Sequence, residues 1–322
     1  MRRVLLFTML AAGAWGAPGY KGSAACKSCH AEISARQEAS HHAGALRPMA
    51  ATEWPERLAE TDLRERSGIA YRYARVREGL RVTITQGPRT LEALLEWAFG
   101  SGAQAMTPVG RYQGAYFEHR ISYYRSTDHP GRTIGHGGAP AVDPLAAFGV
   151  KQDATTIARC FGCHATNVGP GPELREMEAG VRCERCHGPG QAHGSQPAKE
   201  NIRRTKGMDL CAECHRQQEG AGATPEVADP SSVRFQPVGL SVSRCFTKSG
   251  TMTCVTCHDP HQNARRDADH YRAVCQGCHP GAPVAAASAC GRGKAESCLP
   301  CHMRATSPLQ NLRFTDHRIR IY

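Results

Sequence analysis

The stretch GVRCERCHGPG, residues 180–190, contains the pattern Cys-x-x-Cys-His, which the chain of 322 residues repeats seven times. We number the copies motifs 1 to 7 in chain order: CKSCH at 26–30, CFGCH at 160–164, CERCH at 183–187, CAECH at 211–215, CVTCH at 254–258, CQGCH at 275–279 and CLPCH at 298–302. Only 16 residues are His. Seven His directly after seven Cys pairs would arise by chance about once in a billion chains.

This pattern is the attachment signal for c-type haem. Two thiols separated by two residues reach the two vinyl groups of one porphyrin, and the next His becomes the proximal iron ligand. Zinc ribbons and thioredoxin-like pairs also use Cys pairs, but neither requires the following His. We therefore predict seven covalently attached haem c groups. The attachment residues are Cys26, Cys29, Cys160, Cys163, Cys183, Cys186, Cys211, Cys214, Cys254, Cys257, Cys275, Cys278, Cys298 and Cys301. The proximal ligands are His30, His164, His187, His215, His258, His279 and His302.

The N-terminus has the pattern of a secretory signal peptide. Arg2 and Arg3 precede an apolar stretch from Val4 to Trp15, and small residues follow at Gly16 and Ala17. This stretch is too short to span a membrane, and no later segment approaches 18 apolar residues. We expect residues 1–17 to be removed and the protein to be periplasmic or extracellular. Any membrane association would then depend on a partner.

The formal charge of +11, from 40 Lys and Arg against 29 Asp and Glu, requires a correction for the haems. Each haem brings two negatively charged propionates, and its ferric porphyrin core carries about one positive charge. The net charge is therefore roughly −1 per oxidised haem. The basic residues are therefore interpreted as propionate partners or solvated surface. Nucleic-acid binding is not needed to explain them. The expected partners are redox proteins, with donor and acceptor unknown.

The motif spacing divides the mature chain into three parts. Residues 18–50 form the first haem-binding segment, with a short helix over 31–40. Residues 51–150 contain no Cys and are predicted to form a small mixed α/β subdomain. Alternating apolar and polar residues predict a hairpin over 71–85 and a strand over 120–124, whereas TLEALLEWAF at 90–99 favours a short helix.

Residues 151–322 contain the other six motifs and are predicted to form a six-haem cytochrome domain. The motifs begin only 21 to 43 residues apart, which is too short for independent hydrophobic cores. We expect the haems to supply much of the buried apolar area, with short helices carrying the motifs. The predicted fold class is a mainly α or irregular multihaem cytochrome c, organised by its haems, with an α/β insertion after motif 1.

Nine His remain as possible second iron ligands. We favour five because of their surroundings, which are a Gly-rich loop, a position a few residues beyond a motif, or the C-terminal tail: His42, His136, His193, His261 and His317. His193 and His261 lie too close to the preceding motif to turn onto its haem, so each is expected to bind a neighbouring haem. The others left open are His41, His119, His129 and His270. Met side chains are weaker alternatives, at Met49, Met106, Met177, Met208, Met252 and Met303.

At GVRCERCHGPGQAH, MTCVTCHDPH and FTDHRIRI the sequence resembles the cytochrome c-554-related multihaem cytochromes, and YFEHRISYY and RCFGCHAT look similar to longer relatives. The resemblance covers motif 1 and most of residues 110–322. It implies closely packed haem pairs with mostly bis-His iron, and it implies that the five favoured His match distal-ligand positions. Seven motifs exceed those of the tetrahaem cytochrome, so the haem order cannot be transferred. The Cys-x-x-Cys-Lys motif of pentahaem nitrite reductases is absent from the sequence.

Two main functions fit these features. The first is electron transfer along closely packed haems, because seven haems in about 305 mature residues leave little room for a substrate chamber. The alternative is an oxidoreductase in which one five-coordinate haem acts on nitrite, hydroxylamine, sulfite or peroxide. The cluster nominated for that chemistry is His119, Tyr123 and Tyr124. A structural conduit or filament subunit is a third, less favoured reading.

Cys245 and Cys290 are the only Cys residues outside the motifs. In an oxidising compartment two such thiols most simply form a disulfide, which would close a loop around motifs 5 and 6. Two separate buried thiols and thiolate ligation of a haem are the alternatives.

Overall fold

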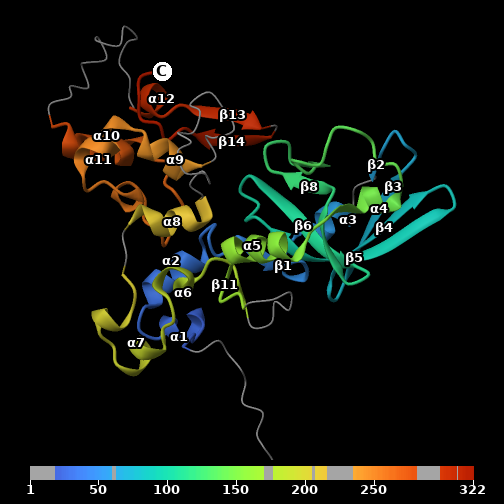
Figure 1. Ribbon diagram of the computed structural model, residues 1–322, viewed down its shortest axis with the longest axis horizontal. Coiled ribbons are helices and arrows are strands. Elements are labelled where there is room, and N and C mark those ends of the chain that lie inside the picture. Colours follow the sequence, from blue (N-terminus) through green and yellow to red (C-terminus); the bar gives the residue numbers. More distant parts are fainter. Residues whose placement is uncertain are drawn as a thin grey trace, which may run out of the picture.

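The computed structural model describes residues 19–59, 63–169, 177–204, 207–215, 235–280, 298–309 and 311–322. The expected signal peptide and Cys290 lie outside these ranges, and so the disulfide prediction is not addressed by the described residues. A large antiparallel sheet occupies one side of the molecule (Figure 1), and the short helices that carry the motifs lie beside it. No helix in the described ranges is both long and apolar enough to cross a bilayer.

The sheet has ten strands in the order β10-β7-β6-β5-β4-β3-β2, with β1 paired to β5 and with β8 and β9 extending from β6. The strands are β1 (Leu46–Pro48), β2 (Leu63–Arg64), β3 (Ala70–Val76), β4 (Gly79–Gln86), β5 (Arg89–Phe99), β6 (Ala105–Tyr112), β7 (Ala115–His119), β8 (Ile121–Tyr124), β9 (His129–Arg132) and β10 (Gly149–Lys151). The predicted hairpin is confirmed as β3 and β4, and the predicted strand at 120–124 as β8.

The helix predicted over residues 90–99 is wrong, because these residues form β5. Leu91, Ala93 and Leu95 are buried and alternate with more exposed residues, which is the two-residue period of a strand. In the antiparallel register with β4, Leu91 lies opposite Ile84 and Leu95 lies opposite Leu80. Leu, Ala and Glu favour helices intrinsically, but the pairing with strands on both sides of β5 outweighs this weak preference.

The sheet region has its own hydrophobic core. Trp54 and Leu58 of α3 (Trp54–Ala59) and Phe148 of α4 (Pro144–Phe148) pack against buried side chains of the sheet such as Leu80 and Leu95. All five of these side chains are at most 1% exposed. A short helical turn, η1 (Met49–Ala51), joins the same core.

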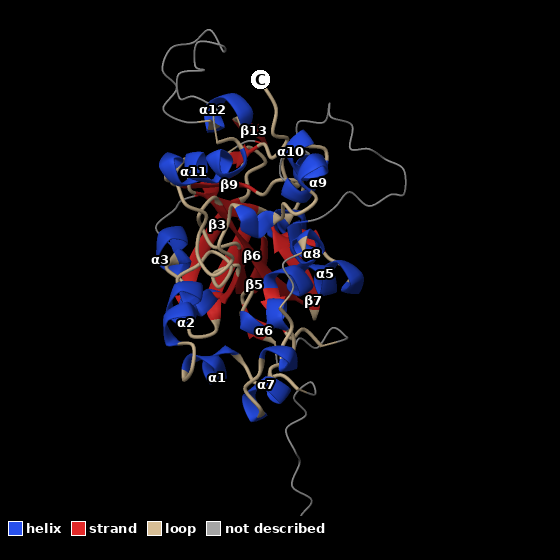
Figure 2. Cartoon of the chain, turned by 90° about the vertical axis from the view of Figure 1, so that its left-hand side faces the viewer, coloured by secondary structure: helices blue, strands red, loops and turns tan. Residues whose placement is uncertain are grey.

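Short helices carry the motifs outside the sheet, as predicted. They lie on α1 (Ser23–Lys27), α5 (Ala154–His164), α6 (Cys183–His187), α8 (Met208–His215), η4 (Cys254–Thr256), α11 (Ala268–Cys278) and α12 (Leu299–His302). The remaining elements are α2 (Ala31–Glu38), α7 (Gln191–Ser195), η2 (Lys199–Asn201), α9 (Gln236–Ser241), α10 (Arg244–Ser249) and the strand pairs β11 (Ala165–Thr166) with β12 (Glu178–Ala179) and β13 (Ala305–Leu309) with β14 (Leu312–Thr315). Figure 2 shows α1, α6 and α7 towards one end and α9 to α12 at the other.

This haem-motif region has little protein core. Beyond Thr166, the buried hydrophobic residues in the described ranges are Ala212, Val238 and Leu240. The short helices therefore need another apolar partner to be held in place.

Candidate haem-ligand site

Four motif histidines each face a second histidine from a distant part of the chain. His30 of motif 1 and His193 stack with ring centres 6.2 Å apart and planes at 19°. His187 of motif 3 and His261 are 6.1 Å apart at 9°. His215 of motif 4 and His42 are 6.1 Å apart at 70°. His258 of motif 5 and His317 are 6.2 Å apart at 43°.

These separations fit two imidazoles on opposite sides of one iron. A metal–imidazole bond is about 2.0 Å long and a ring centre lies about 1.1 Å beyond its nitrogen, which gives about 6.2 Å between the centres of two rings on opposite sides of one metal. Direct stacking contact does not require such a uniform separation at interplanar angles from 9° to 70°. The donor set thus fits an iron between each pair of rings.

Hydrogen bonds at Nδ1 leave the other ring nitrogen of these histidines free to bind a metal. His193 Nδ1 lies 2.9 Å from Ala198 O, His317 Nδ1 lies 2.9 Å from Thr315 O, and His42 Nδ1 lies 3.3 Å from Pro260 O. A carbonyl oxygen only accepts, so the proton is assigned to Nδ1 and the Nε2 lone pair is available. Three motif histidines have the same arrangement, with Nδ1 directed to Ala45 O, Arg203 O and Gln236 Oε1: His164, His187 and His215.

Burial also favours neutral imidazoles at this site. Desolvation lowers the pKa of His164, His215, His258 and His317 below the ordinary value. A neutral ring keeps the lone pair that iron requires.

The C-terminal stretch that presents His317 is held by close packing on α9. A Cβ added to Gly239 would lie 3.1 Å from Arg318 N and 3.2 Å from His317 C, so a side chain there would displace the loop. Ser243 Oγ donates to His317 O at 2.9 Å and accepts from Ile319 N at 2.9 Å. Asp316, 3% exposed, pairs with Arg318 at 2.9 Å and fixes the turn on either side of His317.

The two residues between the cysteines of motif 3 connect it with three other motifs. Glu184, 2% exposed, accepts hydrogen bonds from Lys21 N, Gly22 N and Gly190 N, which join the segment before motif 1 to the loop before His193. Arg185 donates to Gly162 O of motif 2 at 3.2 Å and to Glu213 of motif 4 at 2.8 Å. Sequence reasoning missed these roles, because the two positions of the motif carry no fixed residue type.

Motif cysteines from different motifs also lie side by side. Four such pairs have adjacent thiols: Cys26 with Cys183, Cys163 with Cys214, Cys211 with Cys254, and Cys275 with Cys298. Three further pairs are close enough to interact electrostatically: Cys186 with Cys211, Cys257 with Cys275, and Cys257 with Cys278. Each motif therefore has at least one neighbouring motif at its thiols.

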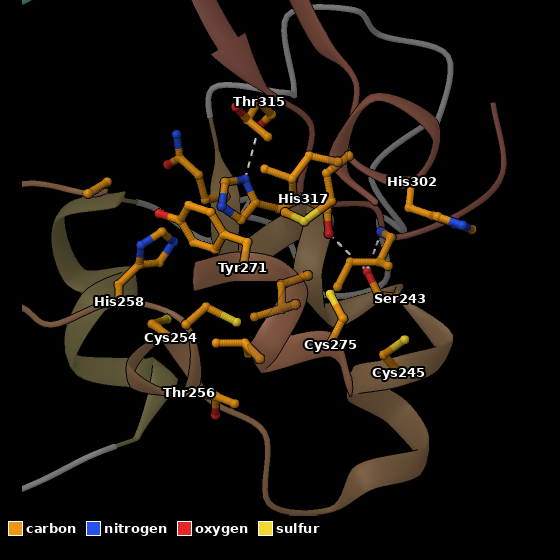
Figure 3. Close-up of a pocket in the computed structure, with 18 of the residues that line it drawn as sticks. Ser243, Cys245, Cys254, Thr256, His258, Tyr271, Cys275, His302, Thr315 and His317 are labelled. Carbon is orange, nitrogen blue, oxygen red and sulfur yellow. Dashed lines mark hydrogen bonds between the residues drawn. The ribbon is translucent and has the colours of Figure 1, made fainter. Parts of the chain in front are cut away.

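Motifs 4 to 7 open into one cavity of about 2760 Å³. Pockets for a single small molecule are about 300–1,000 Å³, so this space suits several large groups. Its wall includes motif histidines from four motifs: His215, His258, His279 and His302. Figure 3 shows part of it, with the His258 and His317 rings next to Tyr271.

The other candidate histidines make no ring contact with a motif histidine, and all sixteen His of the chain lie in the described ranges. His136 Nε2 lies 3.1 Å from Glu118 Oε2, whereas its buried Nδ1 has no hydrogen-bond partner. His119 lies inside the sheet core between Phe148 O and the Tyr73 hydroxyl, at 2.6 and 2.8 Å. His129 is exposed on β9.

His270 lies beside Cys257 O at 3.4 Å, and His41 lies at the wall of the cavity. The rings at motifs 2, 6 and 7, His164, His279 and His302, have no second imidazole in ring contact among the described residues.

The cluster nominated for catalysis is part of the sheet core. His119 is fully buried, and Tyr123 and Tyr124 are each 2% exposed. The Tyr123 hydroxyl contacts Asp128 and Arg57 within the same sheet region. None of the three residues is in ring contact with a motif histidine, so the structure gives no support to this cluster as an open haem face.

Comparisons with known protein families match two overlapping parts of the chain. The family model "Cytochrome c554 and c-prime" matches residues 140–188, and a model of the doubled CXXCH motif matches residues 176–220. No curated protein sequence matches the chain.

Two solved structures share the fold. The outer cell wall cytochrome OcwA is 14% identical with a TM-score of 0.53, over 94% of this chain and 80% of that chain. The undecahaem cytochrome from the S-layer of Carboxydothermus ferrireducens is 15% identical with a TM-score of 0.50, over 94% of this chain and 52% of that chain. The chain thus spans about half of the second protein. The motifs, the family models and the fold together identify the chain as a multihaem c-type cytochrome related to the cytochrome c554 family, with haem c attached covalently through CXXCH motifs.

Proposed function

We propose that the chain is an exported seven-haem cytochrome that transfers electrons along closely packed haems, at least four of them with bis-His iron. The observation that carries the proposal is the set of four cross-motif histidine pairs at 6.1–6.2 Å. Bound haem c supplies reversible one-electron oxidation and reduction of its iron. The chain places the paired rings, and Nδ1 hydrogen bonds fix the tautomer of His42, His187, His193, His215 and His317.

The proposed distal ligands are His193 for motif 1, His261 for motif 3, His42 for motif 4 and His317 for motif 5. His136 is not assigned to a motif, because no motif histidine is in ring contact with it among the described residues. Each distal residue lies far in sequence from the motif that it serves, and His261 directly follows motif 5 although it serves motif 3. Because each distal histidine comes from a segment outside the motif that it serves, the iron bonds would also hold these segments together.

The cysteine neighbours support an order for the haems. Adjacent thiols bring the attached porphyrin edges together, because each thiol is bonded to a vinyl carbon at the edge of its ring. The contacts then give the order 1–3–4–5–6–7, with motif 2 attached at motif 4 through Cys163 and Cys214. We infer an electron path with its ends at motifs 1 and 7 and a branch towards the sheet at motif 2.

Motifs 2, 6 and 7 are proposed to differ from the other four. Their histidines face no second imidazole, and a haem with one strong axial ligand has a high-spin iron. The catalytic alternative is not favoured, since the residues nominated for it lie in the sheet core.

Export is supported by the pattern of residues 1–17, and both structural neighbours are named as proteins of a cell wall or an S-layer. We propose that this chain also works outside the cytoplasm. Its partners would be a redox donor and a redox acceptor that dock near the ends of the path.

Mass spectrometry of protein matured in a host with the cytochrome c machinery tests the composition. The mass should equal residues 18–322 plus seven haems, and acidified acetone should not extract them. After rapid mixing with a one-electron reductant, all haems should become reduced together, with no haem left behind on a separate, slower timescale. Six or fewer haems would show that one motif is not used, and a kinetically isolated haem would contradict the connected path.

A further inference from the structure

Asp259 distinguishes one of the four proposed distal ligands from the other three. His193, His317 and His42 direct Nδ1 to main-chain carbonyl oxygens. His261 instead directs Nδ1 to the carboxylate of Asp259, at 2.9 Å from Oδ1. Its ring is also the one most nearly parallel to its partner, at 9° to His187. The His261 ring is placed like the other proposed distal ligands, and the Asp259 carboxylate at its Nδ1 is what sets it apart.

Asp259 is held in place and kept ionised by several donors. Its Oδ1 also accepts from His261 N at 3.0 Å, and its Oδ2 accepts from Gln262 Nε2 at 3.1 Å and from Arg36 at 3.3 Å. These donors and the Arg36 guanidinium favour the charged form of the carboxylate that accepts from the His261 ring.

A carboxylate that accepts from Nδ1–H draws the proton towards itself and makes the imidazole a stronger electron donor at Nε2. A stronger donor stabilises the ferric more than the ferrous state, so the reduction potential falls. A carbonyl oxygen carries only a partial charge and has a weaker effect in the same geometry.

We propose that Asp259, acting through His261, makes the haem of motif 3 the lowest in potential of the four bis-His haems. The proposal rests on the function proposed above, and Asp259 is a positioning and tuning residue rather than an iron ligand. In the order inferred from the thiols, motif 3 lies between motif 1 and motif 4. Asp259 would therefore place an uphill step between the haem at the N-terminal end and the rest of the path.

The test is a redox titration of the holoprotein carrying Asp259→Asn, followed by visible and electron paramagnetic resonance (EPR) spectra. Asn keeps an oxygen that accepts from Nδ1–H but removes the charge, so the ring should stay in place. We expect the lowest bis-His component to shift to a more positive potential, with its reduction constant raised about tenfold, or about 59 mV for one electron. Its low-spin EPR signal should be retained.

Two matched variants fix the interpretation. Asp269→Asn removes the same charge from an exposed carboxylate that pairs with Arg272, and it should leave that component unchanged. Arg36→Gln removes the cation beside Asp259 and should shift the same component to a more negative potential.

The proposal is overturned if Asp259→Asn leaves every midpoint unchanged, or if its effect equals that of Asp269→Asn. It is also overturned if Asp259→Asn abolishes the low-spin signal, because Asp259 would then only support the ring. The variant His261→Ala distinguishes a failure of the role proposed for Asp259 from a failure of the assignment of His261 as an iron ligand. If that variant leaves all low-spin signals intact, His261 does not bind iron and the pairing with motif 3 is wrong.

Discussion

The sheet region, residues 46–151, and the haem-motif region differ in what holds them together. The sheet region buries Leu80, Ile84 and Leu95 completely against α3 and α4. In the haem-motif region beyond Thr166, the buried hydrophobic residues in the described ranges are only Ala212, Val238 and Leu240. Part of this chain therefore folds around its own side chains, whereas the rest folds around covalently attached haem.

Synthesis of the chain without haem attachment should affect the two regions most differently. The region after residue 166 should be unfolded and rapidly cleaved by protease, because haem supplies its missing apolar core. The sheet region should remain protected, since its main core is built from its own side chains. Limited proteolysis with mass spectrometry of the apo- and holoproteins measures both. A protected apo-fragment beyond residue 166 would contradict the account.

Removal of one distal ligand is the next largest effect. His317→Ala should convert the haem of motif 5 from low-spin to high-spin, raise its potential and free the C-terminal stretch from α9. The visible spectrum and hydrogen exchange of residues 311–322 measure these changes. His129→Ala is the matched control, because His129 is exposed on β9 and faces no motif histidine. An unchanged spectrum in His317→Ala would exclude His317 as a ligand.

A smaller effect concerns pH and acts on the sheet region alone. Burial lowers the pKa of His119 to about 4, although its bond to Phe148 O opposes this shift. The unfolded chain binds a proton at about pH 6.5 and the folded chain only near pH 4, so stability falls as pH decreases between these values. The loss amounts to about 3 kcal/mol for the sheet region.

Hydrogen exchange of β5 and β7 amides between pH 7 and 4, corrected for intrinsic rates, measures this loss. His119→Gln should be less stable throughout and should flatten the dependence. If the slope survives in His119→Gln, another group is responsible.

The same difference explains what the sequence could and could not predict. The seven motifs follow from local chemistry, so Cys183 and Cys186 with His187 were identifiable directly, as were the short helices that carry them. Alternation predicted β3, β4 and β8. Residues 90–99 were misassigned because Leu91, Leu94, Leu95 and Ala98 fit one face of a helix, whereas Leu91, Ala93 and Leu95 fit one face of a strand. Pairing with β4 decides between the two.

The distal ligands were harder to predict because they depend on tertiary contacts. His193 and His261 were expected to serve neighbouring motifs, but their partners, His30 and His187, lie far from them in sequence. His136 had a suitable Gly-rich setting, yet in the fold its Nε2 faces Glu118. The Asp259 contact needed the side-chain geometry, although its place in CHDPH put a carboxylate two residues before His261.

The EPR spectrum of the fully oxidised holoprotein tests the central claim, that four cross-motif histidine pairs bind iron, most directly. Parallel imidazole planes donate to the same iron d orbital and give a rhombic low-spin signal, whereas crossed planes donate to both and give a signal with a large maximum g value. We predict rhombic signals from motifs 1 and 3, at 19° and 9°, and a large-g signal from motif 4, at 70°. High-spin signals should come from motifs 2, 6 and 7. His261→Ala should remove one rhombic signal and His42→Ala the large-g signal. A spectrum with only high-spin iron, or one that neither variant changes, would contradict the account.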